Sequence, residues 1–409
     1  MVVSTPLQTQ MPKAVVILPS NTYRASDFVN AAASLGIDLV VASEQPPPFE
    51  MGDGYLQIDC ADPEAAAESI AELGEAVPID GVIAADDQGV MVAAYASSLL
   101  GLPGNAVDAA AATRDKLLMR ERLARLEIDQ PRFAPLPPGE EAGEVAERVG
   151  FPLVAKPLDR SASQGVIRVD AVEDLDSAVH RIRSIVGEAT LLLESFAPGV
   201  EVAIEGLVSQ GELRVLAVFD KPDTSNGPFF PETLFITPSR LPEDRHTEAK
   251  RVAAAAVEAL GLTSGPVHIE LRDDGQRVRV LEVAARSIGG LCSRSLNFGL
   301  MGTSLETLIL RNAIGLGRED LPREPVASGV LMIPTPSSGV LTAVAGQETT
   351  RQIPGITGID LTIRPGGLVV APPEGDRYLG FVYARARTAE EVESALRKAM
   401  ETLEVQLEG

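Results

Sequence analysis

Two glutamates mark the clearest candidate site for chemistry in this sequence. Glu270 lies in PVHIELRDDG and Glu282 in QRVRVLEVAAR, with DDGQ between the two apolar runs. This pattern predicts a hairpin in which the two carboxylates face each other. Ionised carboxylates in apolar surroundings are costly unless they are paired or bind a metal, and Mg²⁺ accepts one or two carboxylates together with phosphate oxygens. Arg286 is placed to stabilise charge that develops in phosphoryl or acyl transfer. The alternative is a plain hairpin with a salt bridge between Glu270 and Arg286.

A lysine followed by a small, flexible turn forms the second candidate. The segment FPLVAKPLDRSASQGVIRV places Lys156 on a strand, and Ser161, Ser163 and Gly165 in the turn that follows. Backbone amides in such a turn can cover phosphates while a lysine neutralises them. An ordinary hairpin turn with a surface lysine is the alternative.

Two weaker signals flank this segment. In TLLLESFAPGVEVAIEG, Glu194 and Phe196 end an apolar strand and Glu201 follows a Pro-Gly turn. A strand end of this kind can offer backbone groups to an adenine edge, and a nearby carboxylate can bind ribose hydroxyls, although glutamates at strand ends are usually only solvated. Lys116 begins a helical segment after Asp115, where a phosphate can approach, but an exposed helical lysine is the default.

Several function classes are disfavoured by what the sequence lacks. There is no G-x-x-x-x-G-K-[ST], G-x-G-x-x-G, H-E-x-x-H or G-x-S-x-G, and only three histidines are present. The net charge of −23 disfavours binding to nucleic acid or to anionic lipid. No apolar stretch approaches the ~20 residues that span a bilayer. Cys60 and Cys292 fit neither a disulfide framework nor a zinc site, which favours a reduced, cytoplasmic setting.

The elements that must position these residues change in character along the 409 residues, a length that suggests two to four domains. Strand-like runs alternate with helical patterns in the first part, which predicts a parallel α/β sheet. The strands are expected at 14–18, 37–42 and 81–85, and the helices at 24–35, 62–74 and 88–100. Asp86 and Asp87 follow the last of these strands, where open sheets place ligands, although Asp87 is equally suited to capping the next helix.

Short strands dominate after residue 151, interrupted by helices at 172–186 and 245–260, which predicts an α+β unit with a largely antiparallel sheet. We expect a helix over 107–126, a proline-rich linker at 131–143 and a closing helix at 388–403. The predicted organisation is a flexible leader at 1–12, which does not resemble a signal peptide, an N-terminal α/β domain at 13–106, a central domain at 107–325 with lobes at about 107–195 and 196–325, and a C-terminal α+β domain at 326–409.

In this order, the candidate elements resemble the ATP-grasp superfamily. The resemblance implies an N-terminal parallel α/β domain, a central two-lobed ATP-binding α+β domain and a small C-terminal α+β domain. It implies ATP and Mg²⁺, with Mn²⁺ as a substitute, as cofactors. The implied contacts are Lys116, Lys156, Ser161, Ser163 and Gly165 with the phosphates, Glu194, Ser195, Phe196 and Ala197 with adenine, Glu201 with ribose, and Glu270 and Glu282 with Mg²⁺; Arg286 and Lys156 are the implied catalytic residues. Many members carry Asn where this chain has Ala284.

Residues 219–242, with GPVHIELR and EVAARSIGGLCSR, resemble the L-amino-acid ligase and dipeptide synthetase group. This implies that ATP phosphorylates a carboxylate to an acylphosphate, that an amine attacks it, and that ADP and phosphate are released. Glu232 is the candidate for the substrate amine, and Arg286 or Arg294 for its carboxylate. His268 either supports Glu270 or is a satisfied strand histidine.

Two other functions stay open at this point. One is an ATP-grasp carboxylase that acts on an amine with bicarbonate, although no biotin-carrier motif is visible. The other is a non-catalytic nucleotide-binding regulatory protein, which the retained lysines, carboxylates and arginine disfavour. The expected partners are small-molecule carboxylate and amine substrates, and a homodimer is an open alternative because such relatives are commonly dimers.

Overall fold

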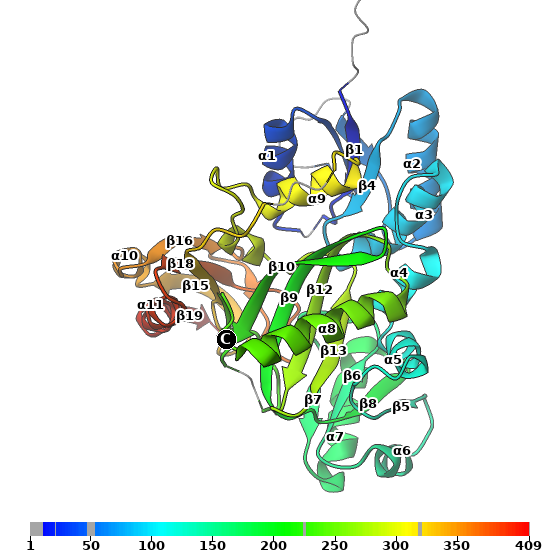
Figure 1. Cartoon of the computed structure of the whole chain (residues 1–409). Coiled ribbons are helices and arrows are strands. Elements are labelled where there is room, and N and C mark those ends of the chain that lie inside the picture. The colour runs from blue at the N-terminus through cyan, green and yellow to red at the C-terminus, as the bar shows by residue number, and fades with distance from the viewer. Residues whose placement is uncertain (1–10, 21, 47–53, 224–225, 318–320, 409) are drawn as a thin grey trace, which may run out of the picture.

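The fold comes from a computed structural model, which describes residues 11–20, 22–46, 54–223, 226–317 and 321–408. It has the predicted N-terminal, central and C-terminal parts (Figure 1). The N-terminal part is a parallel sheet, as predicted, and its strand order is β3-β2-β1-β4, with β3 as a strand that was not predicted. Its elements are β1 (Lys13–Ile17), α1 (Ala25–Leu35), β2 (Asp38–Ser43), β3 (Tyr55–Gln57), α2 (Pro63–Ala76), β4 (Gly81–Ala84) and α3 (Val90–Leu100).

Helices cover both faces of this sheet, which explains why its strands are continuous apolar runs. On one face, α1 packs beside α9 (Leu305–Ala313), a helix that follows the central strands in the sequence (Figure 1). Phe28 of α1 and Ile309 of α9 belong to the same buried cluster. The helix α9 therefore fastens the N-terminal sheet to the large central sheet.

The predicted helix over 107–126 is wrong in one respect, because the chain breaks at Asp115. The two helices are α4 (Val107–Arg114) and α5 (Lys116–Arg125). Asp115 is extended, and its carboxylate accepts hydrogen bonds from the amides of Leu117 at 2.8 Å and Leu118 at 3.0 Å. Such an N-cap satisfies the free amides of a new helix start. It places Lys116 in the first turn of α5.

The prediction of a linker at 131–143 is also wrong. This segment contains β5 (Phe133–Leu136), which pairs with β8 and buries Ala134 and Leu136. Pro135 is tolerated because β5 is an edge strand. The four-stranded antiparallel sheet has the order β5-β8-β6-β7 and is covered by two helices. Its other elements are α6 (Ala142–Val149), β6 (Leu153–Pro157), β7 (Ile167–Val169), α7 (Leu175–Val186) and β8 (Leu191–Ser195).

An eight-stranded sheet forms the centre of the molecule, in the order β13-β12-β9-β10-β11-β14-β18-β16. The strands β11 and β14 pair directly, so the sheet runs without a break from the central part into the C-terminal part. The long helix α8 (Glu243–Leu260) packs against the central strands (Figure 1). The central strands are β9 (Val200–Ser209), β10 (Glu212–Lys221), β11 (Leu234–Thr237), β12 (Ser264–Asp273) and β13 (Val278–Ala284).

The predicted glutamate hairpin is confirmed. In the antiparallel pair of β12 and β13, Glu270 lies directly opposite Glu282, and a bulge follows at Leu271. Residues opposite each other in an antiparallel pair point to the same face of the sheet. The register therefore brings the two carboxylates together.

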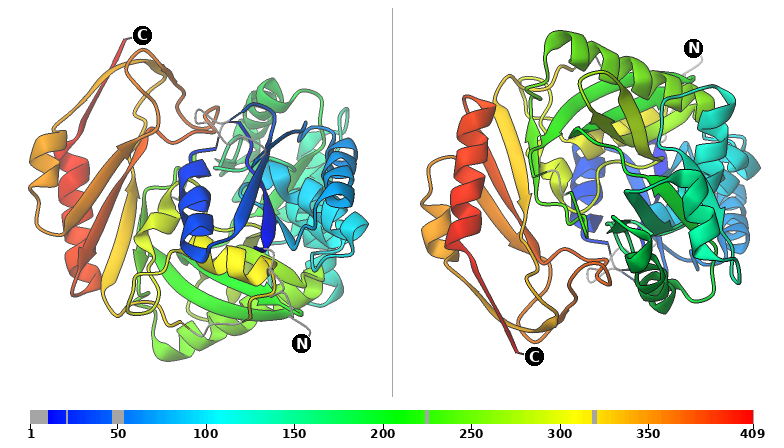
Figure 2. Two further views of the ribbon diagram at one scale, coloured as in Figure 1. Left: turned by 90° about the horizontal axis from the view of Figure 1, so that it is seen from above. Right: turned by 90° about the horizontal axis from the view of Figure 1, so that it is seen from below.

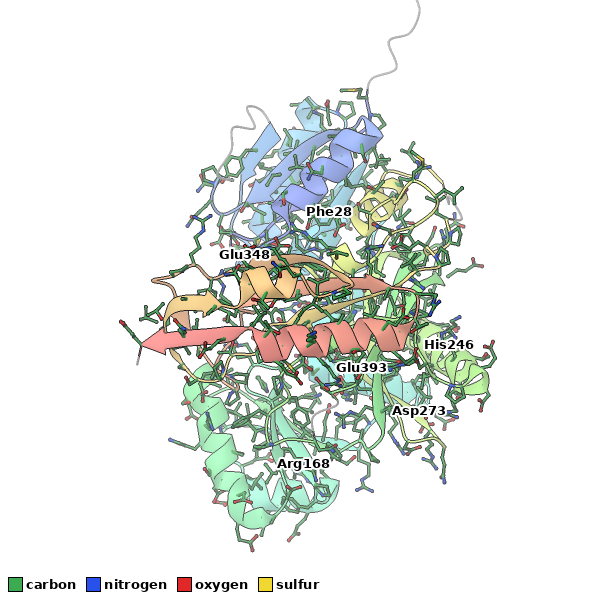
Figure 3. The ribbon with its side chains drawn as sticks, turned by 90° about the vertical axis from the view of Figure 1, so that its left-hand side faces the viewer. Phe28, Arg168, His246, Asp273, Glu348 and Glu393 are labelled. Atoms are coloured by element: carbon green, nitrogen blue, oxygen red, sulfur yellow. The ribbon has the colours of Figure 1, made fainter. Side chains whose placement is uncertain are left out.

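The C-terminal part is a separate lobe beside the central sheet (Figures 2 and 3). It contains a small sheet in the order β17-β15-β19 and contributes three strands to the large sheet. Its elements are β14 (Ala327–Met332), β15 (Gly339–Ala345), α10 (Gln347–Arg351), β16 (Ile356–Leu361), β17 (Leu368–Val369), β18 (Gly380–Ala386), α11 (Ala389–Thr402) and β19 (Glu404–Glu408). Among the described helices, none combines the length and the apolar character needed to cross a bilayer.

Candidate functional site

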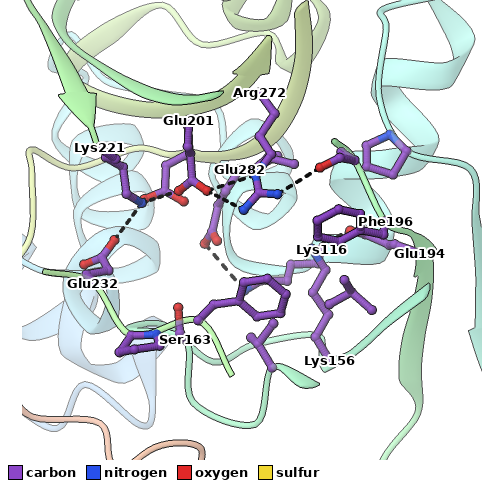
Figure 4. A pocket seen from close by; sticks show the side chains of 18 of the residues that line it. Lys116, Lys156, Ser163, Glu194, Phe196, Glu201, Lys221, Glu232, Arg272 and Glu282 are labelled. Atoms are coloured by element: carbon purple, nitrogen blue, oxygen red, sulfur yellow. Dashed lines mark hydrogen bonds and ion pairs between the residues drawn. The ribbon is translucent and has the colours of Figure 1, made fainter. Parts of the chain in front are cut away.

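A cavity opens between the four-stranded sheet and the large sheet, and most of the predicted site residues line it (Figure 4). We call it the first cavity. The predicted residues on its wall are Lys116, Lys156, Ser163, Glu194, Ser195, Phe196, Ala197, Glu201, Glu232, Glu270 and Glu282. These residues are far apart in the sequence, from Lys116 of α5 to Glu282 of β13, and the fold brings them to the wall of one cavity.

Three side chains form a buried charged cluster at one side of the first cavity. Glu194 accepts from Arg120 Nε at 2.6 Å and pairs with Lys156 Nζ at 2.7 Å. Burial alone would raise the pKa of Glu194, but Arg120 and Lys156 hold that pKa at about 2. Burial lowers the pKa of Lys156, and repulsion from Arg120 and Lys116 lowers it further. Attraction to Glu194 opposes this shift but does not cancel it. One carboxylate serves two cations here, so the cluster keeps positive charge available for an anionic ligand.

This pairing changes the expectation for Glu194. The sequence placed it at an adenine edge, yet its side chain is only 4% exposed and both carboxylate oxygens face cations. Its carboxylate is therefore positioned to hold Lys156 rather than to meet a ligand.

We expect Glu194→Gln to reduce the free energy of unfolding by about 3 kcal/mol at pH 7, because two buried cations lose their shared carboxylate. The depression of the Glu194 pKa from 4.5 to about 2 corresponds to about 3 kcal/mol by linkage. Because the pKa of Glu194 is lower in the folded state, its ionised carboxylate stabilises the fold above pH 4.5. This stabilisation is lost as the pH falls toward 2. Urea denaturation at pH 7, 5 and 3 should show that the difference in stability between wild type and variant shrinks as the pH falls, while Glu401→Gln, at an exposed position of α11, should show no difference. A difference that does not change with pH would contradict this account.

A second charged group lies on three neighbouring strands. Glu201 of β9 is paired in the ladders with Lys221 of β10 and with Arg272 of β12. Arg272 Nε donates to Glu201 at 3.0 Å and its Nη1 donates to the carbonyl of Ala197 at 2.9 Å, and Lys221 also pairs with Glu201. Figure 4 shows Lys221 and Arg272 pointing at Glu201 from either side. Neither cation was predicted from the sequence, because each meets Glu201 only through the pairing of β9 with β10 and β12.

Each of the two hairpin carboxylates faces a lysine. Glu270 lies 3.1 Å from Lys221 Nζ, and Glu282 lies 3.4 Å from Lys116 Nζ. Lys221 also lies 3.2 Å from Glu232. Within the described residues there is no group of three or more His, Cys, Asp or Glu side chains that could hold a metal by itself. Two carboxylates suffice for Mg²⁺ only when phosphate oxygens and water complete its shell, which fits a cavity whose lysines attract phosphate.

A second cavity adjoins the first and shares Arg160, Ser163, Glu232, Glu270 and Glu282 with it. We call it the second cavity. It extends to the carboxyl end of β4 and to the C-terminal part of the chain. Its further lining includes Asp86, Asp87, Arg114, Ser161, His268, Ala284, Arg286, Arg377 and Tyr378. Glu270 and Glu282 therefore lie at the boundary between the first and the second cavity.

Asp87 holds Arg286 at the wall of the second cavity. Arg286 Nε donates to Asp87 at 3.1 Å, and Arg114 Nη1 lies 3.0 Å from the other oxygen of the same carboxylate. The two arginines keep the pKa of Asp87 at about 2 despite its burial. The salt bridge proposed between Glu270 and Arg286 is not the arrangement found, since Glu270 pairs with Lys221.

His268 connects a buried carboxylate to the hairpin. Its Nδ1 lies 3.1 Å from Glu205, and its Nε2 lies 3.6 Å from Glu270. Burial by itself would lower the pKa of His268, but the two carboxylates raise that pKa to about 9. Glu205 also accepts from the amide of Ile288 at 2.9 Å, so the histidine is tied to the loop that carries Arg286.

Two predicted residues lie elsewhere. Arg294 pairs with Asp27 at 2.9 Å and with Asp360 at 2.7 Å, and it does not line either of the two cavities in the described structure. Gly165 is also outside both linings, and its amide donates to the carbonyl of Pro373 at 2.7 Å. Its glycine character is explained by a φ of +71°.

Comparison with known families accounts for this geometry. Residues 149–295 match the ATP-grasp domain, residues 29–104 match the ATP-grasp N-terminal domain, and residues 331–408 match the L-amino acid ligase C-terminal domain 2. This chain belongs to the ATP-grasp superfamily. The superfamily and the fold predicted from the sequence are therefore confirmed.

Similar proteins of this superfamily include several ligases. The ATP-grasp chain superposes on an L-amino acid ligase from Bacillus licheniformis with a TM-score of 0.81 and 26% identity, covering 97% of this chain and 99% of that one. It is 25% identical over 284 residues to an alanine–anticapsin ligase of Bacillus amyloliquefaciens, covering 64% of this chain but only 59% of that protein. It is 29% identical over 239 residues to a D-alanine–D-alanine ligase of Methylibium petroleiphilum, covering 55% of this chain and 70% of that protein.

Proposed function

We propose that this ATP-grasp protein uses ATP to activate a carboxylate and joins it to an amine, with amino acids as both substrates. The observation that carries the proposal is the position of Glu270 and Glu282, which line both cavities. A phosphoryl group bound near them in the first cavity faces a substrate carboxylate in the second. Similarity to an L-amino acid ligase over nearly the whole chain supports the same reaction.

Glu270 and Glu282 are the residues that would hold Mg²⁺, or Mn²⁺ in its place. The ion would supply neutralisation of phosphate charge. Lys116 and Lys156 would then contact ATP phosphates, because both are buried lysines on the wall of the first cavity. Each of these carboxylates has a lysine beside it, Lys221 at Glu270 and Lys116 at Glu282. When the metal binds the carboxylates, ATP phosphates can take their place as partners of the lysines.

The remaining contacts of the nucleotide follow from the lining of the first cavity. We assign Ser195, Phe196 and Ala197 to adenine, because they lie at the end of β8 where backbone groups are available. We assign Glu201 to ribose; its pairing with Arg272 fixes the carboxylate at the wall. Ser161 and Ser163 belong to the turn that would cover the phosphates.

The reaction has two balanced steps. An oxygen of the donor carboxylate attacks the γ-phosphorus of ATP, which forms an acylphosphate and releases ADP. The amine nitrogen then attacks the acyl carbon, the amine loses a proton, and phosphate leaves with one of the original carboxylate oxygens. Arg286 and Lys156 would stabilise the charge that develops, by position and electrostatics rather than by covalent chemistry. Glu232 is an anionic partner for the substrate amine in the second cavity.

Two further proposals concern the chain as a whole. Cys60 is half-buried and Cys292 is buried, and both are free thiols, which supports work in a reducing compartment such as the cytoplasm. We also propose domain limits near residues 106 and 325, on either side of the part that carries the first cavity.

A screen of ADP release tests the proposed function. Purified protein with MgATP is given single amino acids, pairs of amino acids, and bicarbonate with amines. We expect ADP release that depends on a particular pair of amino acids. ADP release that requires bicarbonate and no second amino acid would replace the proposal with a carboxylase, and no stimulated release at all would favour a regulatory nucleotide-binding protein.

A further inference from the structure

A short connection in the C-terminal part reaches both cavities. Residues 373–378 lie between β17 and β18, and we call them the bridging segment. In Figure 2 the connection between these strands extends from the C-terminal lobe toward the central part of the chain. No motif in the sequence marks this segment.

The first end of the bridging segment holds the turn that would cover ATP. Glu374 accepts two hydrogen bonds from Arg181 of α7, at 2.6 Å from Nε and 3.1 Å from Nη2. The carbonyl of Glu374 accepts from the side chain of Gln164 at 2.8 Å, and that of Pro373 accepts from the amide of Gly165 at 2.7 Å. Four hydrogen bonds therefore join the segment to α7 and to the turn between β6 and β7.

The turn needs such outside support. Ala162 and Ser163 have φ angles of +54° and +56°, in the left-handed region that side chains rarely adopt. Such conformations persist when the surroundings determine them. Within the turn, the backbone bonds are Gln164 N to Ser161 O at 3.1 Å and Val166 N to Ser163 O at 3.2 Å. The bonds to Pro373 and Glu374 fix the residues directly after the two strained positions.

The other end of the bridging segment forms a wall of the second cavity. Asp376, Arg377 and Tyr378 all line it. The hydroxyl of Tyr378 donates to Glu232, a carboxylate that lines both cavities. Arg377 Nε donates to the hydroxyl of Tyr23 at 3.3 Å, and its guanidinium lies 5.6 Å above that ring. The same segment thus reaches the central sheet and the N-terminal part.

We propose that the bridging segment couples the two cavities: closure of the 160–165 turn over the nucleotide seats Tyr378 against Glu232 and completes the amino-acid cavity. Tyr378 is then a positioning residue that acts through Glu232. The inference rests on the proposed function for the identity of the substrate. By thermodynamic reciprocity, a bound amino acid must tighten nucleotide binding by the factor with which nucleotide tightens amino-acid binding.

Hydrogen exchange followed by mass spectrometry tests the coupling without an amino acid. Full-length protein is compared with and without Mg²⁺ and the non-hydrolysable ATP analogue AMP-PNP. In wild type we expect nucleotide to slow exchange in both the turn and the bridging segment by about 5-fold or more. Glu374→Gln loses the ion pair with Arg181 but keeps the bonds from the turn to the carbonyls of Pro373 and Glu374, so nucleotide should still slow exchange in the turn but by a smaller factor in the bridging segment. Arg181 and Glu374 are 44% and 39% exposed, so the variant should fold.

Glu348→Gln is the matched control, because it breaks an exposed pair with Arg351 in the same part of the chain. It should keep the wild-type response. Equal protection of the bridging segment in wild type and Glu374→Gln would overturn the coupling, and so would a wild-type segment that does not respond to AMP-PNP. These outcomes do not depend on whether an amino acid stimulates ADP release, so they are separate from failure of the proposed function.

Binding measurements test the other end of the bridging segment. In Tyr378→Phe, the factor by which AMP-PNP tightens binding of the amino acid that stimulates ADP release should fall by about 5-fold or more, and the factor by which that amino acid tightens AMP-PNP should fall equally. The double variant Glu374→Gln/Tyr378→Phe should lose no more coupling between the two ligands than Tyr378→Phe alone. Unchanged coupling in Tyr378→Phe, or losses that add in the double variant, would mean that the residues act separately.

Discussion

Glu282→Gln should lower ATP-dependent turnover by about 10³-fold or more at saturating substrates, which is the scale of losing a charged group that stabilises phosphoryl transfer. Gln keeps the size of the side chain but removes the charge that a divalent cation requires. Glu282 also pairs with Lys116, so the same change leaves that lysine without its carboxylate partner at 3.4 Å. ADP release measured over a range of Mg²⁺ concentrations provides the test.

The fold should survive this change. The Glu282 side chain is 31% exposed and β13 is an edge strand of the large sheet, and the buried Lys116 keeps its hydrogen bond to the carbonyl of Arg160. The melting temperature should stay close to that of wild type, and Glu401→Gln, at an exposed position of α11, should keep full activity. Turnover within threefold of wild type would contradict a metal role for Glu282 and would revive the regulatory alternative.

Arg286→Ala should lower kcat by about 10²- to 10³-fold with little change in KM for ATP, because Arg286 faces the second cavity, where charge develops during transfer. The loss of Arg286 does not leave Asp87 alone, since Arg114 stays 3.0 Å from that carboxylate. Arg286→Lys should recover only part of the rate, because an ammonium cannot reproduce the planar fork of a guanidinium.

The sequence offers Arg286 and Arg294 as candidate partners of the substrate carboxylate, and the variant Arg294→Ala distinguishes between them. Arg294 pairs with Asp27 and Asp360 away from both cavities, so its loss should change stability but leave kcat and both KM values within about twofold. Steady-state kinetics of the three variants, each with its melting temperature, separates these effects. A larger rate loss in Arg294→Ala than in Arg286→Ala would reverse the assignment.

The parts of the site that depend on neighbours along the chain were predictable. The Glu270–Glu282 hairpin has its turn and both strands within one short stretch, so alternation of apolar and polar residues fixed its register. Lys221 and Arg272 were missed because they meet Glu201 only through pairing of β9 with β10 and β12. Glu194 was placed at the end of the correct strand, but its pairing with Arg120 depends on α5 packing across the sheet.

Fold errors had equally specific causes. The alanine-rich segment before Asp115 favours helix so strongly that a single capping carboxylate, which divides α4 from α5, was overlooked. The prolines of 131–143 suggested a linker, although an edge strand accepts Pro135. The pairing of β11 with β14 joins residues almost 100 positions apart, and the approach of 373–378 to the cavities is also non-local. No local pattern encodes such contacts.

In the proposed reaction, ATP phosphorylates a carboxylate held beside Glu270 and Glu282. The most direct test uses the amino-acid pair that gives the fastest ADP release, with the donor carboxylate labelled with oxygen-18. We predict one labelled oxygen in each released phosphate, together with one dipeptide formed for each ADP. Phosphate without label, or ADP release without a dipeptide, would contradict the account.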